Sequence, residues 1–301
     1  MCKIEAIKKY ECPSFWASDM AVCFVYFNSM KSKRLLMNYL FTVEKLKVAK
    51  IKYYTLELCF YGHPPEIFDA IHLRSNSVMF HKEQLCHILE THVSRWYTKL
   101  LFLDSDIIFE NEKWYSQISA LLNTHEVVQP FETCAWLDLT YKKIELERKT
   151  VVLQESGEYY NTNYHPGFGW AFQRQWFKKN GFYRYAITGS GDTLSAAAWL
   201  GQKLPKYYIF PGALEISYNE FKKKLSRPKI TFAPGRIFHL YHGTREARKY
   251  SARHEILNGI CDIRDILSSS FFSSYCFSFK DRLLGEKLET YFIERDDDSI
   301  N

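Results

Sequence analysis

The apolar run AVCFVYF, residues 21–27, is followed at once by an amphipathic pattern, and this succession constrains the fold more than any other feature. A short, continuous apolar run is typical of a strand that is buried on both faces of a parallel sheet. The next segment, residues 31–47, repeats its large apolar residues at helical spacing. Further strands are predicted at 51–60, 99–104 and 126–131, and further helices at 81–92 and 112–122. This alternation predicts an α/β fold with a mainly parallel sheet flanked by helices.

The second half of the chain is less regular. Residues 132–164 have no period and contain Gly, Asn and Pro, so we expect a loop that faces the site, because loops on rigid scaffolds often carry binding groups. The segment 167–173 predicts a return to the sheet, and 236–243 predicts a late strand that ends in two histidines. The C-terminal residues ERDDDSIN are expected to fray as an acidic tail.

Composition bounds the function. No stretch reaches the roughly 20 apolar residues of a membrane span, and the N-terminal MCKIEAIKKYECPSF lacks the apolar run of a signal peptide. We therefore expect no transmembrane segment and a cytoplasmic protein, bacterial or viral, or else a soluble catalytic domain. The net charge of +6 indicates either an ordinary basic surface or a field that attracts an anionic ligand such as a nucleoside diphosphate. Because Lys and Arg are dispersed along the chain, we expect no nucleic acid as a partner.

Two carboxylates interrupt a buried strand in KLLFLDSDIIF, residues 99–109. Burying them without compensation is unfavourable. They follow the apolar part of the strand, and ligands of an open α/β sheet bind beyond the carboxyl ends of its strands. Period two directs Asp104 and Asp106 to the same side, where Mn²⁺ or Mg²⁺ would separate them and keep positions open for phosphate. The alternative is a helix N-cap with a surface salt bridge.

A buried strand that ends in Asp-x-Asp resembles the signature of the GT-A fold glycosyltransferases. The order of three further motifs, GFGWAFQRQWFKKNGF (167–182), GSGD (189–192) and HLYHG (239–243), extends this resemblance over residues 20 to 245. Two features depart from the family pattern: GSGD has one carboxylate rather than two adjacent ones, and 132–164 matches none of its segments.

The resemblance implies a domain organisation. The GT-A catalytic domain, a Rossmann-like, mainly parallel sheet flanked by helices, would span 1–245. Its nucleotide-sugar half would lie at about 20–131 and its acceptor half at about 132–245. A helical extension with the acidic tail would follow at 246–301.

The resemblance also implies a metal centre. Asp106 would coordinate the cation directly, and Asp104 would reach it through water or bind the donor ribose. A third protein ligand would come from His239 or His242, and the sequence allows both. The alternative is that these two histidines end a strand without binding anything.

Three basic residues and one acid complete the charged part of the predicted site. Lys82, which starts a helix before the Asp-x-Asp strand, would reach the diphosphate, although a solvated lysine is the alternative. Arg245 and Arg248 are weaker versions of the same prediction. Asp192 would be the general base that takes the proton of the acceptor hydroxyl. The alternative is that Asp192 is only the N-cap of the helix 192–200.

The remaining predicted contacts are with the nucleotide and the acceptor. In this fold the base and ribose lie near the ends of the first two strands. An aromatic side chain suits a sugar acceptor, because sugars present apolar faces. Stacking or hydrogen bonding to the nucleotide is predicted for Tyr26, Phe27, Asn28 and Glu57, and contact with the acceptor for His165 and Trp170. Core packing is the alternative for each of the aromatic residues.

The leading function is therefore a metal-dependent, inverting glycosyltransferase, hexosyl or pentosyl, with a UDP- or GDP-linked donor and a glycan, protein or lipid acceptor. A nucleotidyltransferase is the second enzyme class, but it normally has a glycine-rich loop after its first strand, where this chain has NSMKSKR. A sugar- or nucleotide-binding protein without turnover is the non-enzyme alternative. Loss of the Asp-x-Asp motif or of the base would favour it, and both are present.

Overall fold

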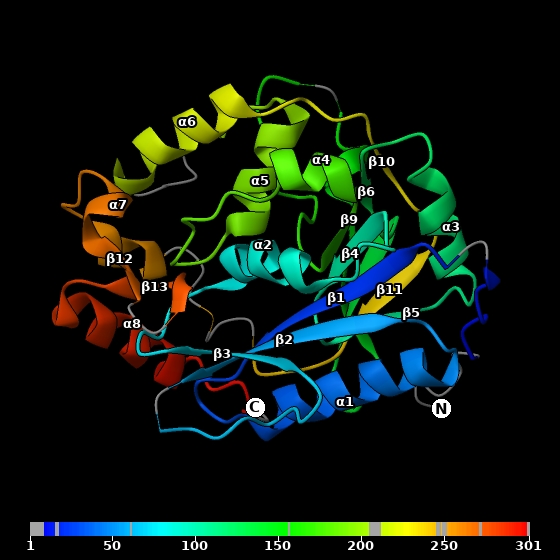
Figure 1. Ribbon diagram of the computed structural model, residues 1–301, viewed down its shortest axis with the longest axis horizontal. Coiled ribbons are helices and arrows are strands. Elements are labelled where there is room, and N and C mark those ends of the chain that lie inside the picture. Colours follow the sequence, from blue (N-terminus) through cyan, green and yellow to red (C-terminus); the bar gives the residue numbers. More distant parts are fainter. Residues whose placement is uncertain are drawn as a thin grey trace.

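The computed structural model describes residues 9–15, 18–60, 62–155, 157–204, 212–244, 248, 252–270 and 273–299. Figure 1 shows a central sheet with α1 on one face and α2, α4 and α5 on the other. Nowhere in these ranges does a helix have the length and apolarity needed to cross a bilayer.

Seven strands form the central sheet in the order β10-β6-β9-β4-β1-β2-β3. Their bounds are β1 (Met20–Phe27), β2 (Tyr53–Phe60), β3 (Ile71–Ser75), β4 (Lys99–Leu103), β6 (Val127–Gln129), β9 (Gly169–Gln173) and β10 (Ile230–Phe232). All of the pairings between these strands are parallel except those that β9 makes with β4 and β6. The predicted α/β fold with a mainly parallel sheet flanked by helices is confirmed.

The strand order reverses between β1 and β4, since β2 and β3 follow β1 on one side while β4 lies on the other. Both strands run parallel, so their carboxyl ends meet at the same edge of the sheet. Open α/β sheets bind ligands at such a reversal point. The turns after Phe27 and Leu103 therefore lie where a site is expected.

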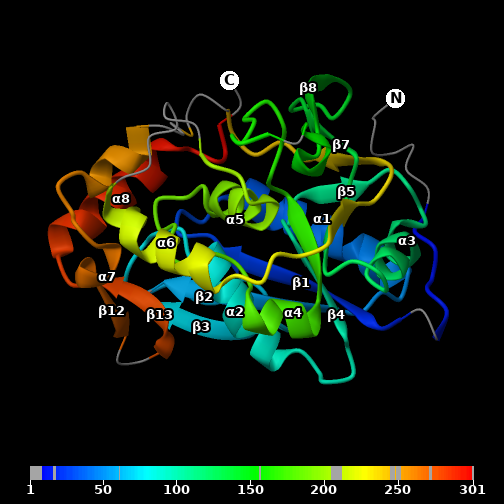
Figure 2. The ribbon, with the colours of Figure 1, turned by 90° about the horizontal axis from the view of Figure 1, so that it is seen from above.

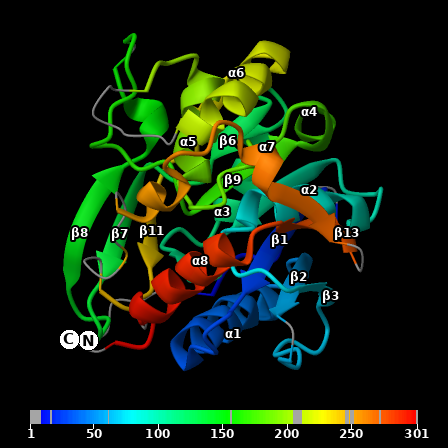
Figure 3. The ribbon, with the colours of Figure 1, turned by 90° about the vertical axis from the view of Figure 1, so that its left-hand side faces the viewer.

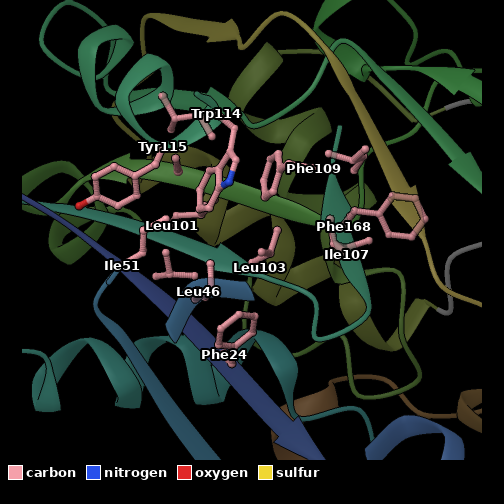
Figure 4. Close-up of a cluster of buried hydrophobic side chains, with 14 of the residues drawn as sticks. Phe24, Leu46, Ile51, Leu101, Leu103, Ile107, Phe109, Trp114, Tyr115 and Phe168 are labelled. Carbon is pink, nitrogen blue, oxygen red and sulfur yellow. The ribbon is translucent and has the colours of Figure 1, made fainter. Parts of the chain in front are cut away.

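Period two divides the core into two layers. On β1, the even-numbered Met20, Val22 and Phe24 pack against α1 (Lys33–Val48), together with Leu101 and Leu103 of β4. Figure 4 shows Phe24, Leu46, Leu101 and Leu103 in this layer. The intervening residues of both strands pack with α2 (Lys82–His92), α4 (Arg174–Lys179) and α5 (Gly191–Leu200). The central strands are thus buried on both faces, as their continuous apolar sequences predicted.

A second sheet has the order β5-β11-β7-β8. Its strands are β5 (Ile107–Phe109), β7 (Thr133–Leu137), β8 (Ile144–Lys149) and β11 (Arg236–His239). Figure 2 shows β5, β7 and β8 together on one side of the central strands. The prediction that 132–164 is a loop throughout was wrong for its first half, because β7 and β8 form an antiparallel hairpin. The hairpin turn is built by Asp138, whose side chain accepts hydrogen bonds from the backbone of Lys142 and Lys143.

The remaining elements flank these sheets. They are α3 (Trp114–Leu121), α6 (Glu215–Lys224), α7 (Ile263–Ile266), the hairpin β12 (Leu267–Ser270) with β13 (Ser273–Phe279), α8 (Arg282–Glu294), and 3-10 turns at 151–153, 212–214 and 252–257. The C-terminal region therefore contains a hairpin as well as helices. Figure 3 views the side of the molecule on which α7, β13 and α8 lie.

The prediction of a frayed acidic tail was wrong for residues 296–299. The carboxylate of Asp298 accepts hydrogen bonds from the Ser32 hydroxyl and from the first backbone amides of α1. Asp297 is buried. The tail is held because acidic side chains stabilise a helix N-terminus, where backbone N–H groups lack intrahelical partners.

Candidate functional site

A cavity of about 490 Å³ opens where the carboxyl ends of β1 and β4 meet. Segments from the whole length of the chain contribute to it, from the end of β1 to the residues after α8. Eleven of the residues predicted from sequence line it: Tyr26, Phe27, Asn28, Lys82, Asp104, Asp106, His165, Asp192, His239, His242 and Arg248. The predicted nucleotide, metal and base residues thus face one shared space.

Strand pairing brings Asp106 to the two histidines. β5 runs antiparallel to β11, with Ile107 opposite His239, and the backbone N–H of Leu240 donates to the Asp106 carbonyl at 2.8 Å. Asp106 Oδ2 lies 2.9 Å from His242 Nε2 and 3.5 Å from His239 Nε2. The two Nε2 atoms are 3.1 Å apart. We call these three residues the Asp106 cluster.

The Asp106 cluster has the donor set and spacing of a divalent-metal site. One ligand atom from each of its residues lies within 4.8 Å of the others, and all three side chains are buried. Among the described residues, Asp106 Oδ1 has no hydrogen-bond partner. A buried carboxylate oxygen without a partner is unfavourable unless a cation or water meets it. Carboxylate and imidazole together suit Mn²⁺ better than Mg²⁺, which prefers oxygen ligands.

The protonation states agree with that donor set. Burial lowers the pKa of His239 to about 3, although the Asp106 carboxylate opposes this. For Asp106, burial alone would raise the pKa, but His239, His242 and Arg248 hold it well below its usual range. At neutral pH the cluster therefore offers an ionised carboxylate and a neutral His239 imidazole, the forms that bind metal.

A second group of charged side chains lies across the cavity. Lys82 Nζ is 2.7 Å from Asp104 Oδ1 and 3.1 Å from Asp192 Oδ2. We call Lys82, Asp104 and Asp192 the Lys82 cluster. Burial lowers the pKa of Lys82, but the two carboxylates outweigh it and hold the pKa well above its ordinary value. The alternative of a solvated lysine is not what the structure shows, because Lys82 pairs with two acids.

The two acids of the Asp-x-Asp motif therefore have different partners. The sequence predicted that both would face one cation, but Asp104 pairs with Lys82 and is not part of the Asp106 cluster. Asp104 has a raised pKa, because burial and the charges of Asp192 and Asp106 outweigh Lys82. The extended conformation ends at Leu103 and resumes at Ile107, so the period of two that predicted a shared side for the two acids does not apply across this turn.

Asp192 is not the N-cap of its helix. α5 begins at Gly191, its N-cap is Ser190, and Asp192 lies in the first turn. Ser190 has a left-handed backbone with φ 67°, which is uncommon outside glycine. Its hydroxyl is held by Arg253 Nη2 and His254 Nε2, each at 3.2 Å. This turn leaves the Asp192 carboxylate free of capping and directed to Lys82.

His165 and Asp192 lie close together around Gly167. A Cβ placed on Gly167 would lie 3.1 Å from His165 Nε2 and 3.4 Å from Asp192 Oδ2. Both side chains line the cavity. A glycine at this position therefore keeps the space between a carboxylate and an imidazole open.

Two predicted contact residues do not reach the cavity. The carboxylate of Glu57 accepts hydrogen bonds from the backbone N–H groups of Glu66 and Ile67, at 2.7 and 3.0 Å. The indole of Trp170 donates to the Pro166 carbonyl at 2.7 Å and the side chain is buried. Both side chains are therefore used to hold loops of the fold, which agrees with the core-packing alternative for Trp170.

Tyr26 and Asn28 line the cavity but are already engaged in local bonds. The Tyr26 hydroxyl donates to Glu66, and the Asn28 amide spans the turn before α1 through Ser32. Of the two weaker basic predictions, Arg248 lines the cavity and contacts His242, whereas Arg245 lies outside the described residues.

Sequence reasoning named no individual residue from two segments that line the cavity. They are Trp136, Arg148, Tyr160, Thr162 and Tyr164 from the segment 132–164, and Arg253, Tyr291, Phe292, Arg295 and Asp297 from the C-terminal region. Density of aromatic and basic residues was the signal available in 132–164. The C-terminal residues gave no such signal, because only tertiary packing brings them to the cavity.

Comparisons with known proteins find similarity in structure alone. No family model and no curated protein matches the sequence. The catalytic domain of Drosophila beta1,4-galactosyltransferase 7 with xylobiose is similar at TM-score 0.38 and 11% identity, covering 89% of this chain and 98% of that chain.

Two further solved structures are similar at the same level. A mutant of the Drosophila enzyme in complex with manganese, UDP-Gal and xylobiose has TM-score 0.40 and 10% identity, with 89% of this chain and 98% of that chain covered. A putative nucleotide-diphospho-sugar transferase from Desulfovibrio desulfuricans G20 has TM-score 0.33 and 9% identity, covering 73% and 81% of the two chains. Values this low do not assign the chain to a family or an activity.

Proposed function

We propose that this chain is a metal-dependent glycosyltransferase of the GT-A type that moves a sugar from a nucleoside-diphosphate-sugar to an acceptor hydroxyl with inversion. The observation that carries the proposal is the Asp106 cluster, a buried carboxylate and two imidazoles with their ligand atoms within 4.8 Å, placed in the cavity at the β1–β4 reversal point. A nucleoside diphosphate is the ligand class that combines a flat base, a ribose and a charge that a metal neutralises.

The donor half of the site binds and orients the diphosphate. Asp106, His239 and His242 would hold the cation, with Mn²⁺ favoured over Mg²⁺ because two of the three ligands are imidazoles. When bound, such an ion stabilises the negative charge of a leaving diphosphate without proton transfer. Arg148, Arg248 and Arg295 line the same cavity and supply planar donors that suit phosphate oxygens.

The nucleoside would lie beside the end of β1. Phe27 and Tyr26 present aromatic surface there, and Asn28 presents an amide. The Tyr26 hydroxyl also donates to Glu66, and the Asn28 amide also donates to the Ser32 carbonyl before α1. UDP and GDP are the two nucleotide classes proposed. Asp104 faces this half of the cavity as well and would bind the ribose or a water next to the metal.

The acceptor half lies around Asp192 and His165. Asp192 would take the proton of the acceptor hydroxyl as that oxygen attacks the anomeric carbon. The ammonium group of Lys82 pairs with both Asp192 and Asp104, and this pairing would orient the Asp192 carboxylate in the cavity. His165, Tyr160 and Tyr164 line this side and suit a sugar acceptor, which presents both hydroxyls and apolar faces. Attack from the side opposite the diphosphate would invert the anomeric centre.

In this proposal two parts of the chain share the site. Residues 20–131 supply the nucleoside contacts and Asp106, and residues 132–245 supply most of the acceptor half together with His239 and His242. The region 246–301 completes the cavity through Tyr291, Phe292 and Arg295. Hexosyl and pentosyl donors are both compatible with these residues.

A panel of sugar nucleotides tests the proposal. The purified chain is incubated with UDP- and GDP-linked hexoses and pentoses, with Mn²⁺ or with EDTA, and both hydrolysis and thermal unfolding are followed. We expect one nucleotide class to raise the unfolding temperature and to be hydrolysed slowly only when Mn²⁺ is present. If no sugar nucleotide binds with Mn²⁺, the proposal fails.

A further inference from the structure

Asp297, three residues beyond α8, touches the rear of the Asp106 cluster. Asp297 Oδ1 lies 3.2 Å from His242 Nδ1, and Arg295 Nε donates to the same oxygen at 2.9 Å. The Asp297 side chain is 7% exposed. A buried carboxylate is thus placed against the nitrogen of His242 that faces away from Asp106.

This contact gives the proton of His242 a fixed place when Nε2 binds a cation. Carboxylates lie at both ring nitrogens, with Asp297 Oδ1 3.2 Å from Nδ1 and Asp106 Oδ2 2.9 Å from Nε2. Ionised carboxylates only accept hydrogen bonds, so a neutral ring donates to one of them and presents its lone pair on the other side. A cation in the cluster would take the Nε2 lone pair and leave Nδ1 to donate to Asp297. Arg248 Nη2 lies 3.0 Å from Nε2 and 3.3 Å from Nδ1, so it does not distinguish the two nitrogens.

The segment that carries Asp297 is fixed at both sides. The next residue, Asp298, accepts from Ser32 Oγ at 2.7 Å and from the Arg34 amide at 2.9 Å, at the start of α1. Directly after His242, Gly243 has φ +77°, and a Cβ placed there would lie 2.7 Å from the Asp296 carbonyl oxygen. This contact between two backbones has no space for a side chain. Residues 296–299 therefore join the residues after β11 to α1.

We propose that Asp297 is a positioning residue of the metal centre, and that residues 296–299 form a C-terminal clasp that holds it against His242. This inference rests on the proposed function, because it assumes that the Asp106 cluster binds a divalent cation. Carboxylates that accept from the second nitrogen of a metal-bound histidine fix the ring and raise its basicity. Here that carboxylate comes from the C-terminal region, 55 residues along the sequence from the histidine that it orients.

Binding of Mn²⁺ alone to the full chain tests the inference, measured by the electron paramagnetic resonance signal of free Mn²⁺. We expect Asp297→Ala to weaken Mn²⁺ binding by about 10- to 100-fold, the usual effect of removing such a partner. Asp297→Asn keeps an acceptor but loses the charge, so about three- to tenfold is expected from the same effect. Asp298→Ala is the comparison variant, since it removes the anchor of the clasp to α1 but leaves the Asp297 carboxylate itself. We expect it to weaken Mn²⁺ binding by less than Asp297→Ala, by about threefold or less.

The outcomes separate the two proposals. If the wild-type chain binds Mn²⁺ and Asp106→Asn does not, the proposed metal centre is supported. An Mn²⁺ affinity of Asp297→Ala within twofold of wild type would then overturn only the inference about Asp297. Equal weakening by Asp297→Ala and Asp298→Ala would also overturn it, because the effect would then be loss of the clasp and not of the contact with His242. If the wild-type chain does not bind Mn²⁺, both proposals fall. Should Asp297→Ala not fold, as judged by thermal unfolding, Asp297→Asn decides by the same criterion.

Discussion

Asp104 and Asp106 are two residues apart in the sequence and are neutralised in opposite ways. Asp104 meets the ammonium group of Lys82 at 2.7 Å, a full positive charge that the protein supplies itself. Asp106 meets two imidazoles, and the pKa of His239 is lowered by burial to about 3. The Lys82 cluster therefore contains its own cation, whereas the Asp106 cluster brings together a carboxylate and two imidazoles, a donor set that suits a metal ion.

This difference separates two tasks that one motif would otherwise combine. A buried carboxylate beside two imidazoles suits an external divalent cation, and through it a diphosphate. A carboxylate that is held by a lysine stays in place without metal and remains available to an acceptor. In the proposed function the two acids of the Asp-x-Asp motif would therefore act differently, Asp106 as a direct metal ligand and Asp104 through water or on the donor ribose.

The largest effect should come from Asp106. Asp106→Ala removes the carboxylate and its charge from the cluster, so metal binding, diphosphate binding and transfer are all expected to fail. We expect transfer to fall by about ten-thousandfold or more, since a metal at a leaving group is worth several kcal/mol. Steady-state transfer and Mn²⁺ binding in the same variant check this. Retained Mn²⁺ binding would place the metal away from the Asp106 cluster.

Asp192→Asn should alter the Lys82 cluster and leave the Asp106 cluster intact. The amide cannot take up the acceptor proton, so transfer should fall by roughly a hundred- to ten-thousandfold, the usual effect of losing a positioned base. Mn²⁺ and nucleotide affinity should stay within about twofold, since those contacts belong to the Asp106 cluster. Near-normal transfer would remove Asp192 from the mechanism and favour a retaining reaction.

Lys82→Met should have an intermediate effect. Without the ammonium group, Asp104 and Asp192 face each other as like charges, which raises the pKa of one of them. We expect transfer at neutral pH to fall by about ten- to hundredfold, and the acidic limb of the pH–rate profile to move to higher pH. Mn²⁺ affinity should hardly change. A large loss of Mn²⁺ affinity instead would show that the two clusters act as one.

The smallest effect concerns stability. Glu83 is buried beside Lys82, and burial together with the charge of Asp192 raises its pKa from 4.5 to about 8, although Lys82 opposes this. Between these values the folded state binds more protons than the unfolded state, so this group's contribution to stability falls as pH rises toward 8. Glu83→Gln removes the titrating group.

The variant should therefore gain a few degrees of unfolding temperature relative to wild type at pH 8 and gain little at pH 5. Thermal unfolding of both proteins at the two pH values measures the difference. A gain at pH 5 that equals the gain at pH 8 would show that Glu83 does not titrate in this range.

The sequence predicted the parts of the molecule that local patterns determine. Continuous apolar runs predicted β1 and β4, helical spacing predicted α1 and α2, and the interrupted strand predicted the position of the site. The hairpin β7–β8 was missed because its polar, half-exposed strand β8 reads as a loop. The alternative of Asp192 as an N-cap came from its residue type, and it was wrong because the left-handed Ser190 places the start of α5 at Gly191.

Other parts depended on tertiary contacts that no local pattern contains. The separation of Asp104 from Asp106 follows from the pairing of β5 with β11 and from the position of Lys82 on α2. Asp297 was read as part of a frayed tail, because a run of acidic residues at a chain end is typical of one. Its contact with His242 exists only because α8 and the start of α1 bring the tail to the cavity.

The central claim is that the Asp106 cluster binds a divalent cation that in turn holds a nucleoside diphosphate. Calorimetric titration of UDP and of GDP into the wild-type chain, first with Mn²⁺ and then with EDTA, tests it most directly. The account predicts that one of the two nucleotides binds at least tenfold more tightly with Mn²⁺, a coupling of about 1.4 kcal/mol or more, and that Asp106→Asn abolishes the difference. Equal affinity with and without Mn²⁺ in the wild-type chain would contradict it.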